Sequence, residues 1–371
     1  MQKRIIYVVN VDWFFISHRL PLAKEALSRG WKVFLVAKNT GKFAELEDIG
    51  IKCIDLDFDR SGRNPIKEVC LIFQLQNIYR KLNAQIIHHV TLKPSIYGTI
   101  AAKRAGVKKI INAVSGLGYS FTGNGRSISK IIIINLLKLA FKDRLSSFIF
   151  QNPDDKELYN SLGFLTDSNY KIIKGAGVDE CLFAYAPPVQ KEIICVTLLS
   201  RMLKDKGIIE FIDAANLLRD KYDEKIKFVL VGGIDLENPA HIKEEQLRLL
   251  CDQTYIEWQG HRKDVRQVYE ESDITCLPSY REGLPKSLVE AMAVGRPIIT
   301  TDAIGCKECV VDGVNGYLVP VKNSILLAER IERLILNPDM RLEMGKKSRE
   351  KMVNEMSLSQ VIAKTFKFYE E

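Results

Sequence analysis

The stretch Pro278-Ser-Tyr-Arg-Glu-Gly-Leu-Pro-Lys-Ser-Leu-Val-Glu-Ala-Met-Ala293 decides how the second half of this sequence is interpreted. It follows a short apolar run, Ile274–Leu277, and its own apolar spacing predicts a helix over residues 286–294. Glu282 falls in the connecting loop, and Glu290 follows in the helix after seven intervening residues. The pattern therefore predicts a buried strand, a polar loop and a helix that carries a carboxylate.

The carboxylate of Glu290 is expected to be partly buried, because its neighbours in the helix are apolar. An unpaired buried charge is costly, and ligand hydroxyl groups are suitable partners, as for the acidic residue that binds a ribose in dinucleotide folds. Gly283, followed by Leu284 and Pro285, fits a tight backbone turn beneath a bound sugar or phosphate. A capping glutamate and a surface glutamate are the structural alternative. Glu282 and Glu290 cannot be adjacent, which disfavours a hydrolase with paired carboxylates.

Two basic residues, Arg201 and Lys206, follow the apolar run Glu192–Leu199, and Gly207 then opens a helix. A cation beside the positive end of a helix dipole suits a phosphate or a diphosphate. Arginine would contact such a group through its planar fork and lysine as a point charge. We therefore predict a diphosphate clamp, with a basic turn as the structural alternative.

Glycines end two further strand-like segments of this half. Gly232 and Gly233 follow Lys227–Val231, where a backbone without side chains would let a ligand approach closely. Gly260 follows Tyr255–Gln259, and backbone groups there would reach the edge of a base. Ordinary turns explain both glycine positions almost equally well.

Strand and helix patterns alternate along both halves of the 371 residues, and they break at Ala186-Pro-Pro-Val-Gln190. Continuous Val- and Ile-rich strands separated by helices imply parallel sheets covered on both faces. We predict an α/β fold with two tandem doubly wound Rossmann-like domains, residues 1–186 and 190–356, that face each other across a cleft. A last helix, about residues 357–371, is expected to pack back across the domain junction.

Charge is distributed unevenly. Residues 1–185 carry 27 Lys and Arg against 16 Asp and Glu, whereas residues 186–371 carry 27 against 30. Residues 69–142 contain 11 Lys and Arg and no acidic residue. Such a surface indicates an anionic partner, and no nucleic-acid-binding motif accompanies it, so a diphosphate and an anionic membrane are favoured. A solvated basic surface is the alternative.

The helix expected at residues 128–145 carries basic residues among many Ile and Leu, so it fits either a membrane surface or a core with a solvated edge. The longest nearly continuous apolar run, Ile131–Leu137, interrupted only by Asn135, is too short to span a bilayer, which needs about 20 residues. The N-terminus reads as a strand and not as a signal peptide. We expect a cytoplasmic protein, peripheral at the inner face of the plasma membrane.

With these residues in view, the second half resembles the large retaining glycosyltransferase family numbered four, whose fold is called GT-B. Arg201, Lys206, Glu282 and Glu290 match the motif of that family in spacing and context. The resemblance implies that Arg201 and Lys206 hold the donor diphosphate and stabilise the departing nucleotide. It also implies that Glu282 binds hydroxyls of the donor sugar, that Glu290 binds the ribose, and that no metal or cofactor is needed.

The first half is similar to family members that extend polyprenyl-diphosphate-linked sugars, notably bacterial N-acetylhexosaminyltransferases acting on undecaprenyl-diphospho-sugars. The similarity lies in Val9–Arg19, His88–Pro94 and Ser115–Tyr119. It implies an acceptor-binding first domain and a nucleotide-sugar-binding second domain. The residues expected to contact the acceptor are His18, Lys93, Ser115, Gly116 and Gly118. A capping or packing histidine and a plain surface lysine are the alternatives for the first two.

One departure from the family concerns the loop Asn10–Ser17, which lacks the glycines that often touch the donor phosphate. Gly116 and Gly118 are the alternative source of that contact. The expected activity is retaining transfer of a sugar, by preference an N-acetylhexosamine, from a UDP-sugar to a polyprenyl-diphosphate-linked saccharide in capsule or lipopolysaccharide assembly. A UDP-sugar 2-epimerase and a non-catalytic nucleotide-sugar or nucleic-acid binding protein are the alternatives.

Overall fold

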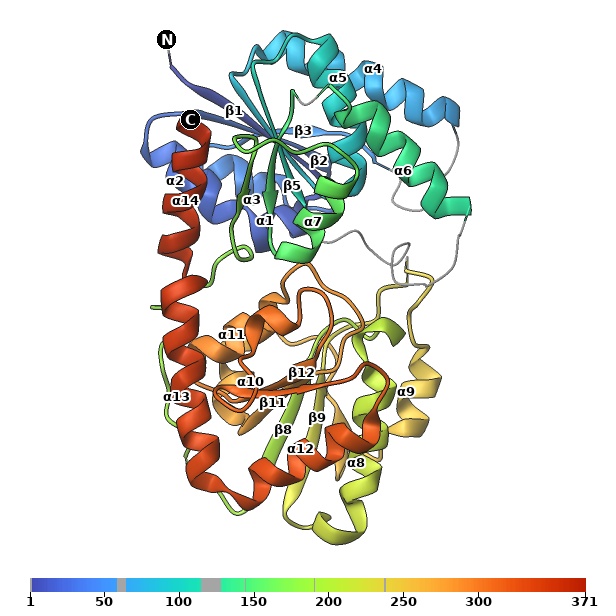
Figure 1. The fold of residues 1–371 in the computed structure, drawn as a ribbon, viewed down its shortest axis with the longest axis vertical. Coiled ribbons are helices and arrows are strands. Elements are labelled where there is room, and N and C mark those ends of the chain that lie inside the picture. The colour runs from blue at the N-terminus through green and yellow to red at the C-terminus, as the bar shows by residue number, and fades with distance from the viewer. Residues whose placement is uncertain (1, 59–64, 115–127, 144, 190, 237) are drawn as a thin grey trace. The chain divides into compact units, whose positions relative to one another are not determined.

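Parallel strands form the centre of each of two structural units in the computed structural model, which describes residues 2–58, 65–114, 128–143, 145–189, 191–236 and 238–371. The first unit comprises Met1–Ala176 with Val361–Glu371, and the second comprises Gly177–Gln360. Both are doubly wound α/β units, as the alternating sequence pattern predicts (Figure 1).

The first sheet has seven strands in the order β3-β2-β1-β4-β5-β6-β7. Its strands are β1 (Arg4–Val11), β2 (Lys32–Lys38), β3 (Lys52–Asp55), β4 (Ile86–Val90), β5 (Lys109–Val114), β6 (Ser147–Phe150) and β7 (Tyr170–Ile172). The helices are α1 (Asp12–His18), α2 (Leu20–Ser28), α3 (Phe43–Asp48), α4 (Pro65–Leu82), the π-helix η1 (Pro94–Gly98), α5 (Thr99–Arg104), α6 (Ile128–Phe141) and α7 (Pro153–Ser161).

Alternate residues of β1 pack on opposite faces of this sheet. Ile5 and Tyr7 belong to a hydrophobic cluster that includes residues of α1, α2 and α3, whereas Ile6 and Val8 belong to one that includes residues of α4 and α5. All four side chains are fully buried, because a central parallel strand is covered on both faces. This arrangement leaves only the strand ends open to a ligand.

The second sheet has six strands in the order β10-β9-β8-β11-β12-β13. Its strands are β8 (Ile194–Leu199), β9 (Ile226–Val231), β10 (Ile256–Trp258), β11 (Ile274–Leu277), β12 (Ile298–Thr301) and β13 (Gly316–Val319). Its helices are the 3₁₀ turns η3 (Lys204–Lys206) and η4 (Lys307–Cys309), with α8 (Ile208–Tyr222), α9 (Glu244–Leu250), α10 (Val265–Glu271), α11 (Lys286–Val294), α12 (Ser324–Leu336) and α13 (Pro338–Glu355).

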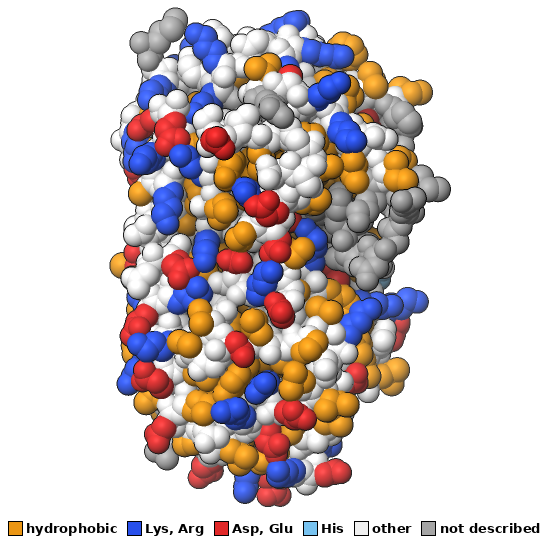
Figure 2. Space-filling view, viewed as in Figure 1, with side chains coloured by type: hydrophobic (Ala, Val, Ile, Leu, Met, Phe, Trp, Pro, Cys, Tyr) orange, Lys and Arg blue, Asp and Glu red, His pale blue; other side chains and the backbone are white. Residues whose placement is uncertain are grey.

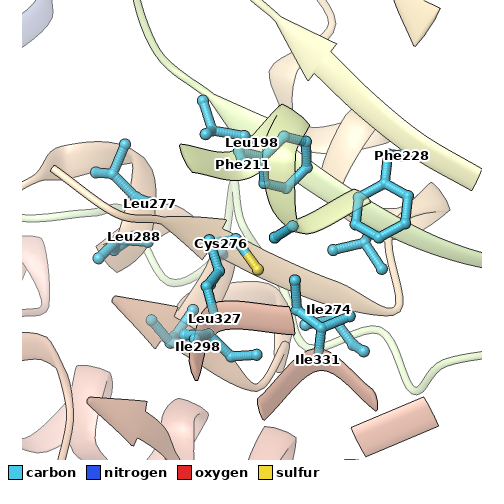
Figure 3. Close-up of a cluster of buried hydrophobic side chains, with 14 of the residues drawn as sticks. Leu198, Phe211, Phe228, Ile274, Cys276, Leu277, Leu288, Ile298, Leu327 and Ile331 are labelled. Carbon is cyan, nitrogen blue, oxygen red and sulfur yellow. The ribbon is translucent and has the colours of Figure 1, made fainter. Parts of the chain in front are cut away.

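The core of the second unit fills the space between this sheet and its helices. Figure 3 shows Phe211 of α8 and Ile331 of α12 among side chains from the strands, such as Leu198, Phe228 and Ile274. These residues come from the apolar runs of the sequence. Because burial of such side chains is the dominant driving force of folding, the core fixes the positions of the strand ends.

The boundary between the units differs from the break expected at Ala186–Gln190. The first unit ends at Ala176, because the segment after it is already anchored on the second unit. Arg296 is buried and donates through Nη1 to the Ala186 carbonyl at 2.8 Å. Arg349 donates to the Phe183 carbonyl, also at 2.8 Å. Proline and valine composition marks a change in the sequence, but these two arginines set the structural boundary.

The last helix, α14 (Leu358–Glu370), contributes to the core of the first unit from Val361 onward. Tyr369 is buried, and its hydroxyl lies 2.6 Å from Nδ1 of His88 in β4 and 3.4 Å from the hydroxyl of Tyr7 in β1. Burial lowers the pKa of His88 well below its ordinary value, so the ring is neutral at physiological pH. The C-terminal helix is thus bonded to the two central strands of the first sheet.

Candidate active site

The order of the second sheet creates a topological switch point between β8 and β11. Ligands of doubly wound sheets bind beyond the carboxyl ends of the strands at such a point. The loops that follow the two strands are bonded there, since Tyr280 donates its backbone N–H to the Asp205 carbonyl at 2.9 Å. Gly207, with φ of +73°, allows the close approach, because a Cβ atom would lie 2.2 Å from the Pro278 carbonyl oxygen.

Lys206 and Glu282 form an ion pair across this switch point. The Lys206 ammonium contacts Oε1 of Glu282, and both side chains are largely buried, at 14% and 16% exposure. Ser279 Oγ lies 2.8 Å from the same carboxylate oxygen. The residues predicted to hold diphosphate and sugar are therefore adjacent, and Ser279 is a third member that the sequence alone did not single out.

Arg201 follows β8 and is more exposed, at 43% of its side chain. Its Nη1 lies 2.5 Å from Oδ2 of Asp235, which follows β9. Each cation of the predicted clamp thus has its own carboxylate partner. Asp235 escaped the sequence analysis, since nothing in the local pattern links residues on separate strands.

Glu290 lies in α11 and is 7% exposed, which agrees with the burial expected from its apolar neighbours. Lys286, one helical turn earlier, places its Nζ 3.1 Å from the carboxylate. Burial raises the pKa of the Glu290 carboxyl, and the Lys286 charge opposes that rise. The sequence analysis predicted a ligand hydroxyl as partner; the structure adds a lysine on the same helix.

Gly232, Gly233 and Gly260 hold neighbouring loops together. A Cβ atom on Gly232 would lie 1.7 Å from the Ser200 carbonyl oxygen, so the backbone after β9 touches the backbone after β8. Gly232 donates to the Gly260 carbonyl at 2.7 Å, and Gly233 accepts from the Met202 N–H at 3.0 Å. The close approach explains Gly232 as loop packing, whereas contact of Gly232, Gly233 and Gly260 with a donor stays a prediction.

The turn at Gly283–Pro285 leads into α11. Leu284 belongs to the hydrophobic core, and Pro285 caps the helix, accepting from the Leu288 N–H at 3.1 Å. Gly305, with φ of +79°, packs against this turn, where a Cβ atom would lie 2.3 Å from the Glu282 carbonyl oxygen. The turn therefore positions Glu282, and contact of Gly283, Leu284 and Pro285 with a donor stays a prediction.

Tyr280 and Glu210 also meet at this edge. The Tyr280 hydroxyl donates to Glu210 Oε1 at 2.6 Å, which joins the loop after β11 to the first turn of α8. Burial and the adjacent carboxylate raise the pKa of Tyr280. This bond helps to fix the loop that carries Glu282, and both residues were missed by the sequence analysis.

In the first unit, two predicted acceptor residues are described. His18 ends α1 and stacks on Phe14, with ring centroids 4.0 Å apart and an interplanar angle of 4°. Lys93 follows β4, and its Nζ lies 2.7 Å from Oε1 of Glu68 in α4. Both thus have protein contacts of their own, and their contact with an acceptor stays a prediction. Ser115, Gly116 and Gly118 lie outside the described residues.

The acid-free stretch 69–142 is partly neutralised by acids just beyond its ends. Glu68 pairs with Lys93, and Asp143 lies 2.5 Å from the Nζ of Lys103. The sequence count therefore overstates the unbalanced charge of the folded unit. Lys138 and Lys142, by contrast, are exposed on and just after α6.

Helix α6 has both buried apolar residues, as a core helix would, and exposed apolar residues, as a membrane-surface helix would. Leu137 and Phe141 are fully buried, whereas Ile131 and Ile132 are half exposed and Leu139 is 69% exposed. On α4, exposed apolar side chains also occur, namely Ile66, Val69 and Phe73. In Figure 2, hydrophobic and basic side chains adjoin on the part of the surface where Figure 1 places α4 and α6.

Two general properties of the described residues bear on ligands and membranes. Within the ranges given above, no three His, Cys, Asp or Glu side chains are arranged so that they could hold a metal ion. Among the same residues, no helix has both the length and the apolar character needed to cross a membrane.

Comparison with known families places a match on each half of the chain. The family described as glycosyl transferases group 1 matches residues 184–351. The family described as glycosyl transferase 4-like matches residues 4–152. The two matches correspond to the two structural units and leave the C-terminal helix outside both.

Two relatives with named activities align over most of the chain. An enzyme of Campylobacter jejuni, named N,N'-diacetylbacillosaminyl-diphospho-undecaprenol alpha-1,3-N-acetylgalactosaminyltransferase, is 31% identical over 354 residues, covering 90% of this chain and 91% of the relative. An Escherichia coli enzyme, named UDP-Gal:alpha-D-GlcNAc-diphosphoundecaprenol alpha-1,3-galactosyltransferase, is 23% identical and covers 90% of this chain and 88% of the relative.

Solved structures share the fold at lower identity. Anabaena HepE in complex with UDP and glucose superposes with a TM-score of 0.78 at 17% identity, covering 99% of each chain. Sucrose-phosphate synthase from Thermosynechococcus elongatus gives a TM-score of 0.80 at 17% identity, covering 99% of this chain and 98% of that one. These similarities show that the predicted GT-B fold is correct.

Proposed function

This chain belongs to the glycosyltransferases of group 1, and on that premise we propose that it transfers an N-acetylhexosamine from a UDP-sugar to a saccharide carried on polyprenyl diphosphate. The two relatives described above act, by name, on sugars linked to undecaprenyl diphosphate, and they align with this chain over nearly its whole length. The proposed product keeps the anomeric configuration of the donor and extends a cell-surface glycan.

The arrangement around Lys206 and Glu282 supports this function best. It brings a cation and a sugar-binding carboxylate together at the switch point of the second sheet, with Arg201 on the neighbouring loop. Two cations suit the two phosphates of UDP, and the nearby carboxylate suits sugar hydroxyls. Because Arg201 and Lys206 are each paired with a carboxylate, a diphosphate would have to displace or share Asp235 and Glu282.

In the proposed reaction, the bond between the anomeric carbon and the β-phosphate oxygen breaks, and its electron pair stays on that oxygen. The acceptor hydroxyl forms the new bond on the same face of the sugar, and its proton passes to the departing phosphate oxygen. Arg201 and Lys206 stabilise the negative charge that grows there, and fixed charged groups of this kind often contribute more to catalysis than any other effect. The reaction needs no metal, because these side chains supply the positive charge.

Glu290 completes the donor site by accepting hydrogen bonds from the ribose. It lies in α11, the helix that follows the loop holding Glu282. Burial strengthens a hydrogen bond between a carboxylate and a hydroxyl, because few water molecules compete. The charge of Lys286 opposes the rise that burial produces in the pKa of this carboxyl.

The first unit is proposed to bind the acceptor at the cytoplasmic leaflet. The exposed apolar residues of α6 lie beside Lys138 and Lys142, a combination that suits an interface between anionic headgroups and acyl chains. The proposed acceptor is held in such a membrane by its polyprenyl chain. Peripheral binding would bring His18, Lys93, Ser115, Gly116 and Gly118 to its diphosphate.

One experiment separates this function from the alternatives. The protein is incubated with a panel of UDP-sugars and a polyprenyl-diphosphate-linked saccharide, and products are identified by mass spectrometry. We expect the acceptor to gain one N-acetylhexosamine residue. Epimerised UDP-sugar formed without an acceptor would instead identify the 2-epimerase, for which the comparisons give no support. Tight UDP-sugar binding with neither product would identify a binding protein.

A further inference from the structure

Thr91, directly after β4, has a backbone conformation that its side chain disfavours. Its φ is +73°, in the left-handed region, and threonine is β-branched, so the conformation is strained. Its Oγ1 is buried and has no hydrogen-bond partner in the described part of the protein. A strained residue that holds a hydroxyl unbonded at a strand end is a candidate for ligand contact.

Asn10, near the end of the neighbouring strand β1, shows a related feature. Its Oδ1 is buried and likewise lacks a partner among the described residues. The register of β1 with β2 shifts between Val8 and Val11, which indicates a β-bulge around Asn10. Bulges are common next to active sites, where they redirect a side chain.

The two residues lie at the carboxyl ends of neighbouring strands of the first sheet. The last paired positions of β1 and β4 are Val8 and His89, and Asn10 and Thr91 each follow two residues later. Strands β1 and β4 flank the topological switch point of this sheet, which is the position where doubly wound sheets bind ligands. Two unbonded polar atoms therefore belong to residues at the expected binding edge of the first unit.

The surroundings hold Thr91 in place. Its carbonyl accepts from the Ser95 N–H at 3.1 Å and from Ser95 Oγ at 2.7 Å, at the start of the π-helix η1. His89 is fixed between Tyr79 and Asn112, with a contact of 3.1 Å to each. A π-helix is rare and is often found at functional sites. The strain is thus maintained by a rigid network on both sides of Thr91.

The carboxylate of Asp12, close to Asn10 in the chain, is already used by hydrogen bonds within the fold. The Asp12 carboxylate is fully buried and accepts from the backbone N–H groups of Trp13 and Thr40, each at 2.7 Å, and from that of Lys42 at 3.1 Å. These bonds tie the loop after β2 to the end of β1. Because the Asp12 carboxylate already accepts these bonds, the unbonded acceptor oxygen near the end of β1 is Oδ1 of Asn10.

We propose that Asn10 and Thr91 form a subsite for a sugar hydroxyl group. The Asn10 Oδ1 can only accept a hydrogen bond, so its partner must be a donor, which a hydroxyl is and an ionised phosphate is not. The Thr91 hydroxyl can accept from or donate to the same sugar. This assignment rests on the proposed function. It gives a role in sugar binding, in place of a phosphate contact, to the glycine-free segment Asn10–Ser17, which the structure shows as the end of β1 and most of α1 instead of the expected loop.

The hydroxyl belongs either to the acceptor saccharide or to the donor sugar, and kinetics with each substrate varied in turn distinguishes them. We expect Thr91→Gly to fold at least as stably as the wild type, because glycine relieves the left-handed strain. It should nevertheless raise KM for one sugar substrate about 2- to 12-fold, the range expected for one lost hydrogen bond. Thr91→Ser keeps the hydroxyl and should restore KM.

Substitutions at Asn10 test the chemistry of the ligand. Asn10→Ala should raise the same KM, whereas Asn10→Asp keeps an acceptor oxygen and should stay within about twofold of the wild type, since a carboxylate also accepts from hydroxyls. A phosphate ligand would give the opposite result, with Asn10→Asp the most impaired variant, and would overturn the proposal. Unchanged KM for both substrates in Thr91→Gly and Asn10→Ala would overturn it as well.

Ser146 provides a matched control. Its buried Oγ also lacks a partner among the described residues, but it immediately precedes β6, at the amino-terminal edge of the same sheet. Ser146→Ala should leave both KM values unchanged. If the wild-type protein transfers sugar to none of the polyprenyl acceptors, the proposed function fails. Calorimetric titration of the same variants with UDP-N-acetylhexosamines and free saccharides then decides the subsite, which is overturned if no variant alters any affinity.

Discussion

Arg201 Nη1 lies 2.5 Å from Oδ2 of Asp235, so a residue of the predicted diphosphate clamp is bonded to a carboxylate from the next strand. The pair is partly exposed, with 43% of the arginine side chain accessible, which limits its contribution to stability. Its importance is therefore expected in ligand affinity.

Asp235→Asn should bind UDP more tightly than the wild type, by about two- to fivefold, because removal of the carboxylate that pairs with Arg201 leaves this arginine free for the diphosphate. Isothermal titration calorimetry measures the change. Glu332→Gln is the matched control, since Glu332 pairs with Lys221 at 2.5 Å near the far end of α8 and should not affect UDP. Weaker UDP binding by Asp235→Asn would mean that Asp235 itself contacts the nucleotide.

Lys206→Ala should lower kcat by about 10²- to 10³-fold, the scale seen when one stabilising group at a developing charge is lost. Lys204 lies in the same 3₁₀ turn and is exposed, so Lys204→Ala is the matched control and should retain nearly full turnover. Arg201→Ala combined with Lys206→Ala should cost less than the product of the single effects, because both act on one diphosphate. Strict multiplication of the two effects would argue against a shared ligand.

Glu290→Gln should weaken UDP binding by about 10- to 100-fold, corresponding to about 1.5–3 kcal/mol for a hydrogen bond to a charged group. It should also alter the pH dependence of stability. Burial raises the pKa of Glu290 in the folded state above its ordinary value of 4.5, so the unfolded chain loses this proton first. The wild type therefore loses stability as the pH rises from 4.5 through the raised pKa, and the glutamine variant lacks this loss.

Thermal unfolding of both proteins between about pH 4 and 8 tests that prediction, with the difference in Tm growing toward neutral pH. Glu244→Gln is the control, because Glu244 pairs with Arg248 at the same helical spacing but is 54% exposed. If the difference in Tm between Glu290→Gln and the wild type does not change with pH, the charge of Lys286 fully offsets the effect of burial on the pKa of Glu290.

Transfer should proceed at the same rate in the presence of excess EDTA, because Arg201 and Lys206 supply the positive charge at the leaving diphosphate. The measurement compares initial rates before and after chelation, and then after addition of Mg²⁺ or Mn²⁺. Loss of activity on chelation with recovery on metal addition would show that the two side chains are not sufficient.

Replacing Lys138 and Lys142 with glutamate should release the protein from phosphatidylglycerol vesicles, since each basic residue near an anionic surface contributes about 1 kcal/mol. Transfer to long-chain lipid acceptors should slow more than transfer to short, water-soluble analogues. The control replaces Lys346 and Lys347 of α13, which lie in the second unit and should leave vesicle binding intact. If the α6 variant still co-sediments with the vesicles at low salt, the membrane-binding surface lies elsewhere on the protein.

The strands and the loop motifs could be predicted because the residue patterns that indicate them lie close together in the sequence. Alternation of apolar runs with helical spacing located β8 and β11, and the residues that follow a parallel strand must lie at its carboxyl edge. That is sufficient to bring Arg201, Lys206 and Glu282 into one region of the second unit.

The partners of these residues could not be predicted, because they come from distant positions in the chain. Asp235 reaches Arg201 from the segment after β9, and Glu68 neutralises Lys93 from a helix of the same unit. The left-handed φ of Thr91 is equally invisible, since it is imposed by packing and not by the residue's own preference. Periodicity reports which side of an element is buried, but not which polar atoms meet there.

The bonds of Tyr369 to His88 and Tyr7 set an order of events during translation. The ribosome delivers strands β1 to β7 first, yet the core of their unit also needs Phe366 and Tyr369 from α14. Those residues emerge only after Gly177–Gln360 have been made. Domains generally fold as they leave the ribosome, so the second unit can close its sheet while the first still exposes apolar surface. The first unit to be synthesised is therefore the last to be completed.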